Sequence, residues 1–103
     1  GSRSEIVRAA KLLAAEAADA ASAFDIQDID EDALTRRLYT ADIPDPDVII
    51  RTSGEMRLSN FLLWQAAYAG LVCTDTLWPD FDRYELLRCI LAFQGRSRRF
   101  GGV

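Results

Sequence analysis

The side chains best suited to binding chemistry are Arg51, Arg57 and Ser59, which surround or follow the flexible residue Gly54. They follow an apolar run typical of a buried strand and precede one typical of a buried helix. Guanidinium groups and the backbone N–H groups at a helix start both bind phosphate oxygens. Ligands of open α/β sheets bind at the edge where strands lead into helices. The pattern therefore indicates a site for a phosphorylated, anionic ligand.

The same residues also have ordinary structural interpretations. Arg51 and Arg57 are equally expected as surface arginines at the ends of a strand and a helix, and Ser59 as a helix N-cap. Glu55 is expected to pair with Arg57 or with a neighbouring arginine. Every basic residue except Lys11 is an arginine, so arginine content alone does not distinguish these interpretations.

Composition excludes several function classes. The 103 residues contain no histidine, which excludes a Ser-His triad and a histidine-ligated zinc site on this chain. The net charge is −4, and no basic stripe with interleaved aromatic residues marks a nucleic-acid surface. No apolar run is long enough to span a bilayer, and no signal-peptide pattern opens the chain. Cys73 and Cys89 lack CxxC spacing, so we expect reduced thiols in a cytoplasmic protein, with a disulfide between them as the alternative.

Hydrophobic periodicity and turn signals predict the elements that position the arginines. The predicted order is helix, helix, strand, helix, strand, helix, over residues 4–23, 30–38, 47–51, 60–69, 71–77 and 82–96. Ser59 or Asn60 is expected to cap the fourth element and Gly70 to end it. Strand-helix-strand connectivity predicts a parallel strand pair with a crossover.

Two parallel strands do not form a stable sheet alone, because parallel strands are normally covered on both faces and flanked by neighbours. We therefore predict an α/β fold that is incomplete on this chain. Residues 1–103 are expected to be the carboxyl-terminal portion of a single domain. The missing strands are expected from an absent amino-terminal half or from a separate chain.

Four runs of sequence match motifs of one known family, at residues 47–65, 74–81, 98–102 and 1–6. The first run resembles the carboxyl-terminal signature of the cis-prenyltransferases, which are also called the undecaprenyl diphosphate synthase or isoprenyl transferase family. The resemblance implies a parallel-sheet sandwich covered by helices, assembled as a homodimer or a heterodimer. It also implies magnesium-dependent condensation of isopentenyl diphosphate with an allylic diphosphate, giving a cis-polyprenyl diphosphate.

The resemblance also carries residue roles onto this chain, none of them catalytic. It implies that four residues bind the isopentenyl diphosphate head group, namely Arg51, Arg57, Leu58 and Ser59. Glu55 is a possible supporting residue. Arg99 and Gly101 lie in a tail motif that reaches the partner subunit's diphosphate site in the family.

Two departures from the family pattern stand out. The amino-terminal half, with its Asp-Gly-Asn-Gly-Arg loop for the allylic diphosphate, is missing from the chain. Gly70 occupies the position where the family has a magnesium-binding glutamate, and glycine offers no carboxylate. No metal ligand is therefore predicted on this chain, although Mg²⁺ is the expected cofactor of the whole protein.

The leading hypothesis is a cytoplasmic prenyltransferase that makes a lipid carrier and contacts membranes peripherally through its lipid product. One alternative is a non-catalytic subunit of a dimer that uses its tail to complete a partner's site. Another keeps the fold but performs short-chain or head-to-middle coupling.

Overall fold

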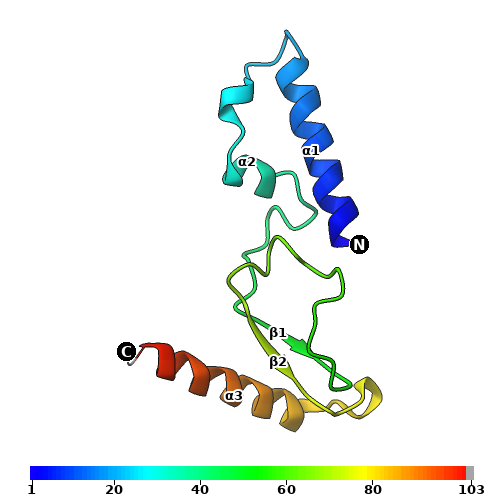
Figure 1. The fold of residues 1–103 in the computed structure, drawn as a ribbon, viewed down its shortest axis with the longest axis vertical. Helices are drawn as coiled ribbons and strands as arrows, with labels where there is room; N and C mark the ends of the chain where they lie inside the picture. Colours follow the sequence, from blue (N-terminus) through cyan, green and yellow to red (C-terminus); the bar gives the residue numbers. More distant parts are fainter. Residues whose placement is uncertain (102–103) are drawn as a thin grey trace. The chain divides into compact units, whose positions relative to one another are not determined.

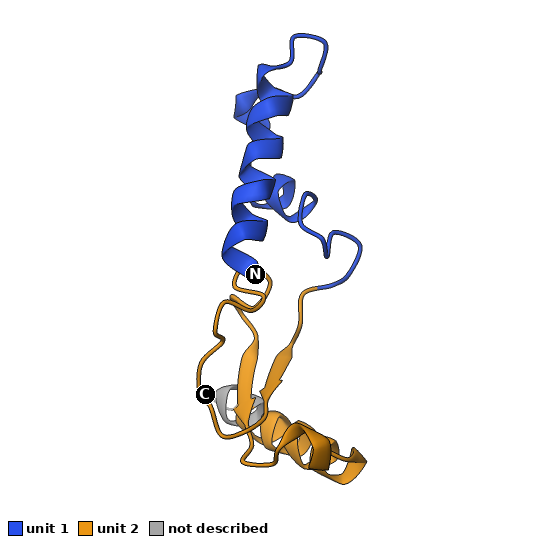
Figure 2. Ribbon diagram, turned by 90° about the vertical axis from the view of Figure 1, so that its right-hand side faces the viewer, with its two compact units in different colours: residues 1–44 blue, residues 45–103 orange. Residues whose placement is uncertain are grey.

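Figure 1 shows the computed structural model, which describes the backbone of residues 1–101 and the side chains of residues 1–96. Its elements in chain order are α1 (Ser2–Ala18), the 3-10 helix η1 (Ile26–Asp28), α2 (Glu31–Thr35), β1 (Val48–Arg51), β2 (Gly70–Cys73), the 3-10 helix η2 (Trp78–Asp80) and α3 (Arg83–Gly101). They fall into two compact units, Gly1–Pro44 and Asp45–Val103 (Figure 2). Among the described residues, no helix is both long and apolar enough to cross a membrane.

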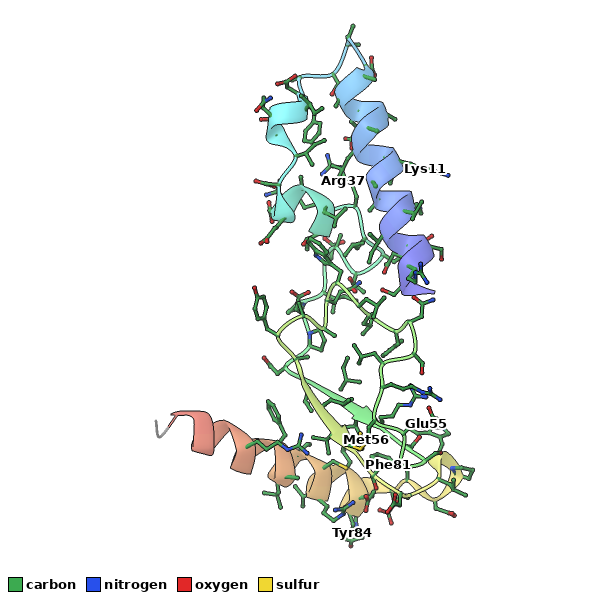
Figure 3. All side chains as sticks on the ribbon, viewed as in Figure 1. Lys11, Arg37, Glu55, Met56, Phe81 and Tyr84 are labelled. Atoms are coloured by element: carbon green, nitrogen blue, oxygen red, sulfur yellow. The ribbon has the colours of Figure 1, made fainter. Side chains whose placement is uncertain are left out.

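In the first unit, α1 packs against α2 through small buried side chains that include Ala9, Leu13 and Ala33. Arg37 lies between the two helices (Figure 3). Its Nε donates to Oε2 of Glu16 at 2.6 Å and its Nη2 donates to Oε1 at 3.0 Å. This two-pronged hydrogen bond lowers the pKa of Glu16 and raises that of Arg37. The apolar contact and the Arg37–Glu16 ion pair therefore both join α1 to the part of the chain that contains α2.

The helix predicted over 4–23 is confirmed in type, but it ends at Ala18. The reason is local competition, since the Asp19 carboxylate accepts a hydrogen bond from the Ala21 N–H at 2.9 Å. Such aspartate turns offer the backbone an alternative to the helix. The helix predicted over 30–38 likewise ends early, at Thr35, and continues as turns.

The second unit is built on a parallel pair of strands. Val48 of β1 lies opposite Gly70 of β2, and Arg51 lies opposite Cys73. The helix α3 packs against β2 (Figure 1), and its residue Cys89 is almost fully buried. The predicted parallel pair and its helical cover are confirmed.

The helix predicted over 60–69 is wrong, because this segment forms consecutive turns. Ser59, Asn60 and Leu62 have φ values of 51°, 63° and 47°, and left-handed residues do not start a right-handed helix. Most helical stability in proteins comes from packing of an apolar face. Here Phe61 is 54 % exposed and Tyr68 is 99 % exposed, so that packing is missing.

Three further boundaries differ from prediction. Gly70 begins β2 instead of ending a helix, and β2 stops at Cys73 instead of residue 77. The strand stops because the Thr74 hydroxyl oxygen accepts a hydrogen bond from the Thr76 N–H at 3.2 Å, which turns the chain. The last helix extends beyond the predicted residue 96, to Gly101.

Candidate functional site

The residues singled out by sequence lie on the segment that follows β1, which we call the arginine turn (residues 51–57). Its first corner is fixed by backbone hydrogen bonds to the segment after β2. The Ser53 N–H donates to the Thr76 carbonyl at 3.2 Å, and the Gly54 N–H donates to the Thr74 carbonyl at 2.7 Å. The position of the turn is therefore set by the neighbouring strand.

Gly54 is required at that corner for two reasons. Its φ is +73°, a conformation that side-chain-bearing residues adopt only at a cost. A β-carbon at this position would also lie 2.8 Å from Oδ1 of Asp75. The glycine therefore lets the turn approach the segment after β2 closely.

The two arginines of the turn converge on one carboxylate. The Arg51 Nη2 donates to Oε2 of Glu55 at 2.8 Å, and the Arg57 Nε donates to the same oxygen at 3.3 Å. The Arg51 Nη1 also donates to the Arg57 carbonyl at 2.9 Å. Figure 3 shows Glu55 on the chain that follows β1. Two cations thus share a single anionic oxygen.

Exposure differs between the two guanidinium-bearing side chains. Arg51 is 30 % exposed and Arg57 is 77 % exposed, while the Glu55 side chain is 44 % exposed. Arg51 is therefore the fixed member of the pair, and Arg57 is the member that solvent and a ligand reach most easily. An added anion must share or displace the Glu55 carboxylate, because that carboxylate already accepts from both arginines.

The other predicted site residues are not drawn into this cluster. Ser59 is exposed and caps no helix, and among the described residues no hydrogen bond joins it to the arginines. Leu58 is half-buried. The Arg99 side chain lies outside the described residues, and Gly101 is the last residue of α3. The role of the tail motif therefore stays a prediction.

Sequence analysis missed a second polar cluster, beside the arginine turn. The Thr74 hydroxyl donates to Oε1 of Glu85 at 2.5 Å, and the Arg88 Nη2 donates to the Thr74 hydroxyl oxygen at 3.2 Å. Arg88 also forms an ion pair with Glu85. The hydrogen bonds from Arg88 and Thr74 hold the pKa of Glu85 at about 2. The i, i+3 spacing of Glu85 and Arg88 was the available signal.

Another spacing suggests a local role for Glu85, and this explains why the polar cluster was not predicted. Asp82 and Glu85 have the spacing of a capping box, in which Glu85 would bond back to the Asp82 backbone. Half of such a box is present, because the Glu85 N–H donates to Oδ1 of Asp82 at 2.9 Å. The Glu85 carboxylate instead bonds Thr74, a residue on another element.

The arginine turn and α3 also line a common open cavity of about 630 Å³. Gly54 lines it from the turn, Asp75 from the segment after β2, and Arg88 and Arg96 from α3. The cavity thus brings two arginines of α3 to the corner of the turn at Gly54.

Comparison with known proteins assigns this chain to a family. The family model described as putative undecaprenyl diphosphate synthase matches residues 1–101. The chain belongs to this family. The resemblance drawn from the sequence motifs is therefore confirmed.

Individual relatives agree with the family assignment. The isoprenyl transferase of Heliobacterium mobile is 56 % identical over 103 residues, and that of Bacillus subtilis is 50 % identical over 103 residues. In both cases the match covers all of this chain and 39 % of the relative. The chain thus spans about two fifths of the length of these curated relatives.

A solved structure also supports the fold assignment. The crystal structure of lavandulyl diphosphate synthase from Lavandula x intermedia in complex with dimethylallyl diphosphate matches with a TM-score of 0.82 and 38 % sequence identity. The match covers 90 % of this chain and 39 % of that one. The predicted fold, a partial α/β domain of the undecaprenyl diphosphate synthase type, is confirmed.

The described residues do not form a site for the magnesium that this family resemblance implies. No group of three His, Cys, Asp or Glu side chains among them is placed to hold a metal ion. Gly70 begins β2 beneath the Phe93 ring, and a β-carbon at Gly70 would lie 2.8 Å from Cε2 of that ring. A carboxylate at this position therefore requires Phe93 to move.

Proposed function

We propose that the full-length protein containing this chain is a cis-prenyltransferase, which condenses isopentenyl diphosphate with an allylic diphosphate. In this reaction the allylic carbon–oxygen bond to diphosphate breaks, a bond forms to the terminal alkene carbon of isopentenyl diphosphate, and a proton is lost. Membership of the family and relatives named isoprenyl transferase support the proposal. Its substrates follow from the same family relationship.

Within that reaction we assign the arginine turn to the diphosphate group of isopentenyl diphosphate. The observation that carries this assignment is the convergence of Arg51 and Arg57 on one oxygen of Glu55. A diphosphate oxygen has the same charge and accepts the same donors as that carboxylate oxygen. Binding therefore replaces the Glu55 oxygen by a phosphate oxygen at Arg57, the more exposed partner. Leu58 and Ser59 follow directly on the chain and complete the proposed set.

The proposed cofactor is Mg²⁺, with its carboxylate ligands drawn from outside the described residues. These residues offer no assembled carboxylate group, so this chain's own contribution is to bind the diphosphate through cationic groups. Removing divalent cations from the full-length protein with a chelator should abolish product formation, and added Mg²⁺ should restore it. Unchanged activity after chelation would contradict the metal requirement.

The direct test of the function is incorporation of labelled isopentenyl diphosphate into longer products by the full-length protein with Mg²⁺ and an allylic diphosphate. Mass analysis of the products also separates chain elongation from short-chain or head-to-middle coupling. The latter is relevant because one solved relative is a lavandulyl diphosphate synthase. No incorporation with any allylic diphosphate would overturn the proposal.

A second candidate function is a non-catalytic subunit of a heterodimer, which the missing carboxylate at Gly70 favours. Arg57→Ala separates the two candidates. A catalytic chain should show a KM for isopentenyl diphosphate raised by about 10- to 100-fold, because hydrogen bonds to charged groups contribute about 1.5–3 kcal/mol. A supporting subunit should tolerate the change. Arg36→Ala is the matched control, since Arg36 forms an exposed ion pair with Asp32 on α2.

We also propose a homodimer, with a heterodimer as the alternative, because the tail motif at Arg99 and Gly101 resembles one that reaches a partner's site. Light scattering of the full-length protein at several concentrations tests this. A mass that stays that of one chain would contradict it. Cytoplasmic localisation and membrane contact through the lipid product remain predictions.

A further inference from the structure

The backbone of Thr74 is hydrogen-bonded to the arginine turn at two points, Arg51 and Gly54. The Thr74 N–H donates to the Arg51 carbonyl at 2.9 Å, and the Thr74 carbonyl accepts from the Gly54 N–H at 2.7 Å. Arg51 is the less exposed and more fixed arginine of the pair. A displacement of Thr74 therefore moves Arg51 and the corner at Gly54 together.

The Thr74 side chain is buried and uses its full hydrogen-bonding capacity. The residue is 3 % exposed. Its hydroxyl donates to Oε1 of Glu85 at 2.5 Å and accepts from the Arg88 Nη2 and the Thr76 N–H, both at 3.2 Å. A hydroxyl has one donor and two acceptor lone pairs, and all three are occupied. The side chain is thus held in one orientation.

The Glu85 carboxylate, which accepts the hydrogen bond from Thr74, is also held in place. The Glu85 side chain is 16 % exposed and lies on the first turn of α3, where Arg88 neutralises its charge from the next turn. With a pKa of about 2, Glu85 is ionised throughout the physiological range. The hydrogen bond from Thr74 is therefore charge-assisted, the stronger class of side-chain hydrogen bond.

We infer that Thr74 and Glu85 are positioning residues for the isopentenyl diphosphate site, through which α3 holds the arginine turn in the geometry that brings Arg51 to Arg57. This inference rests on the proposed function. The hydrogen bonds that join Thr74 to the arginine turn go to the backbone of Arg51 and Gly54, and Glu85 acts through Thr74. Sequence gives no direct sign of the coupling, because residue 51 ends β1, residue 74 follows β2 and residue 85 lies in α3.

The test uses four variants of the full-length protein. Thr74→Val removes the hydroxyl while keeping the shape, and Thr74→Ser keeps the hydroxyl. Glu85→Ala removes the acceptor from the other side. Thr35→Val is the matched control, since the Thr35 hydroxyl donates to the Glu31 carbonyl within α2, away from the arginine turn in sequence.

Two readouts are measured for each variant: the equilibrium Kd for isopentenyl diphosphate by calorimetric titration, and the KM values for both substrates. Thr74→Val and Glu85→Ala should raise the Kd and KM for isopentenyl diphosphate about tenfold, the factor that corresponds to loss of one buried hydrogen bond. The KM for the allylic diphosphate should change by less than about twofold, and Thr74→Ser should restore most of the loss, because the effect is local to one hydroxyl.

If Thr74 and Glu85 only stabilised the fold, their variants would contain a smaller fraction of active protein, with unchanged KM values for both substrates. That result would overturn the inference. A Kd for isopentenyl diphosphate within about twofold of wild type in Thr74→Val would overturn it as well, since about twofold is below the effect of a lost hydrogen bond. Should Thr74→Val fail to fold, Glu85→Ala decides by the same thresholds. Wild-type protein that does not bind isopentenyl diphosphate contradicts the proposed function, whereas binding that the variants leave intact contradicts only this inference.

Discussion

At the scale of single residues, the arginine turn places one carboxylate between two cations. Arg51 and Arg57 would repel each other without an intervening anion, and the Glu55 oxygen at 2.8 Å and 3.3 Å removes that repulsion. The same carboxylate competes with any incoming anion. On the proposed function, Glu55 therefore keeps the arginines together and makes diphosphate binding an exchange of anions. A non-bridging phosphate oxygen then takes over the contact with Arg57, the more exposed partner.

Gly54 provides a prediction about the stability of the turn. Gly54→Ala should destabilise the full-length protein by about 1–2 kcal/mol, the cost of a left-handed side-chain-bearing residue, with more added by the contact to Asp75. Gly95→Ala is the control, because Gly95 lies within α3 with open space around it and should stabilise by about 0.5–1 kcal/mol. Denaturant unfolding measures both. Equal effects of the two substitutions would contradict the requirement for glycine at the turn.

Glu85 provides a prediction about pH. Its folded-state pKa of about 2 lies below the ordinary value of 4.5, so its contribution to stability is complete above about pH 5. That contribution is lost as the pH falls from about 5 towards 2, because protonation removes the charge that Arg88 and Thr74 bind. The difference in unfolding free energy between wild type and Glu85→Gln should therefore shrink across this window. A constant difference from pH 6 to pH 2.5 would contradict the assignment.

At the scale of elements, the sequence predicts those parts whose signals are local. The strand pair, the first and last helices and the turn after β1 all follow from apolar runs, caps and glycine. The helix predicted over 60–69 fails because Phe61 and Tyr68, on its expected apolar face, are exposed in the described part of the chain. The bond between Thr74 and Glu85 was not predictable, since it joins separate elements through side chains that each have a local alternative role.

The contact between α3 and β2 gives a prediction about Gly70. Gly70→Glu should lower the Mg²⁺ concentration that half-saturates the full-length protein, because it adds an oxygen ligand of the kind magnesium prefers. It should also lower the melting temperature, because its β-carbon meets the Phe93 ring. Gly70→Ala is the control, with the same steric effect and no carboxylate. An identical Mg²⁺ dependence in both variants would contradict the role of the carboxylate.

At the scale of the whole molecule, the chain carries only part of what the proposed reaction needs. It spans about two fifths of its curated relatives, and its described sheet has two strands. Parallel strands are normally covered on both faces and flanked by further strands. On the proposed function, we expect the allylic diphosphate to bind residues of the full-length protein other than these 103, whereas the proposed isopentenyl diphosphate site lies within them.

This division predicts the behaviour of residues 1–103 expressed alone. They should incorporate no labelled isopentenyl diphosphate into longer products, because one reactant lacks its binding site and cannot be held beside the other. The full-length protein assayed in parallel should form product, and its Arg57→Ala variant should do so with a raised KM for isopentenyl diphosphate. Product formation by the 103 residues alone, at a rate comparable to the full-length protein, would show that the reaction needs no residues beyond them and would contradict the division of the site.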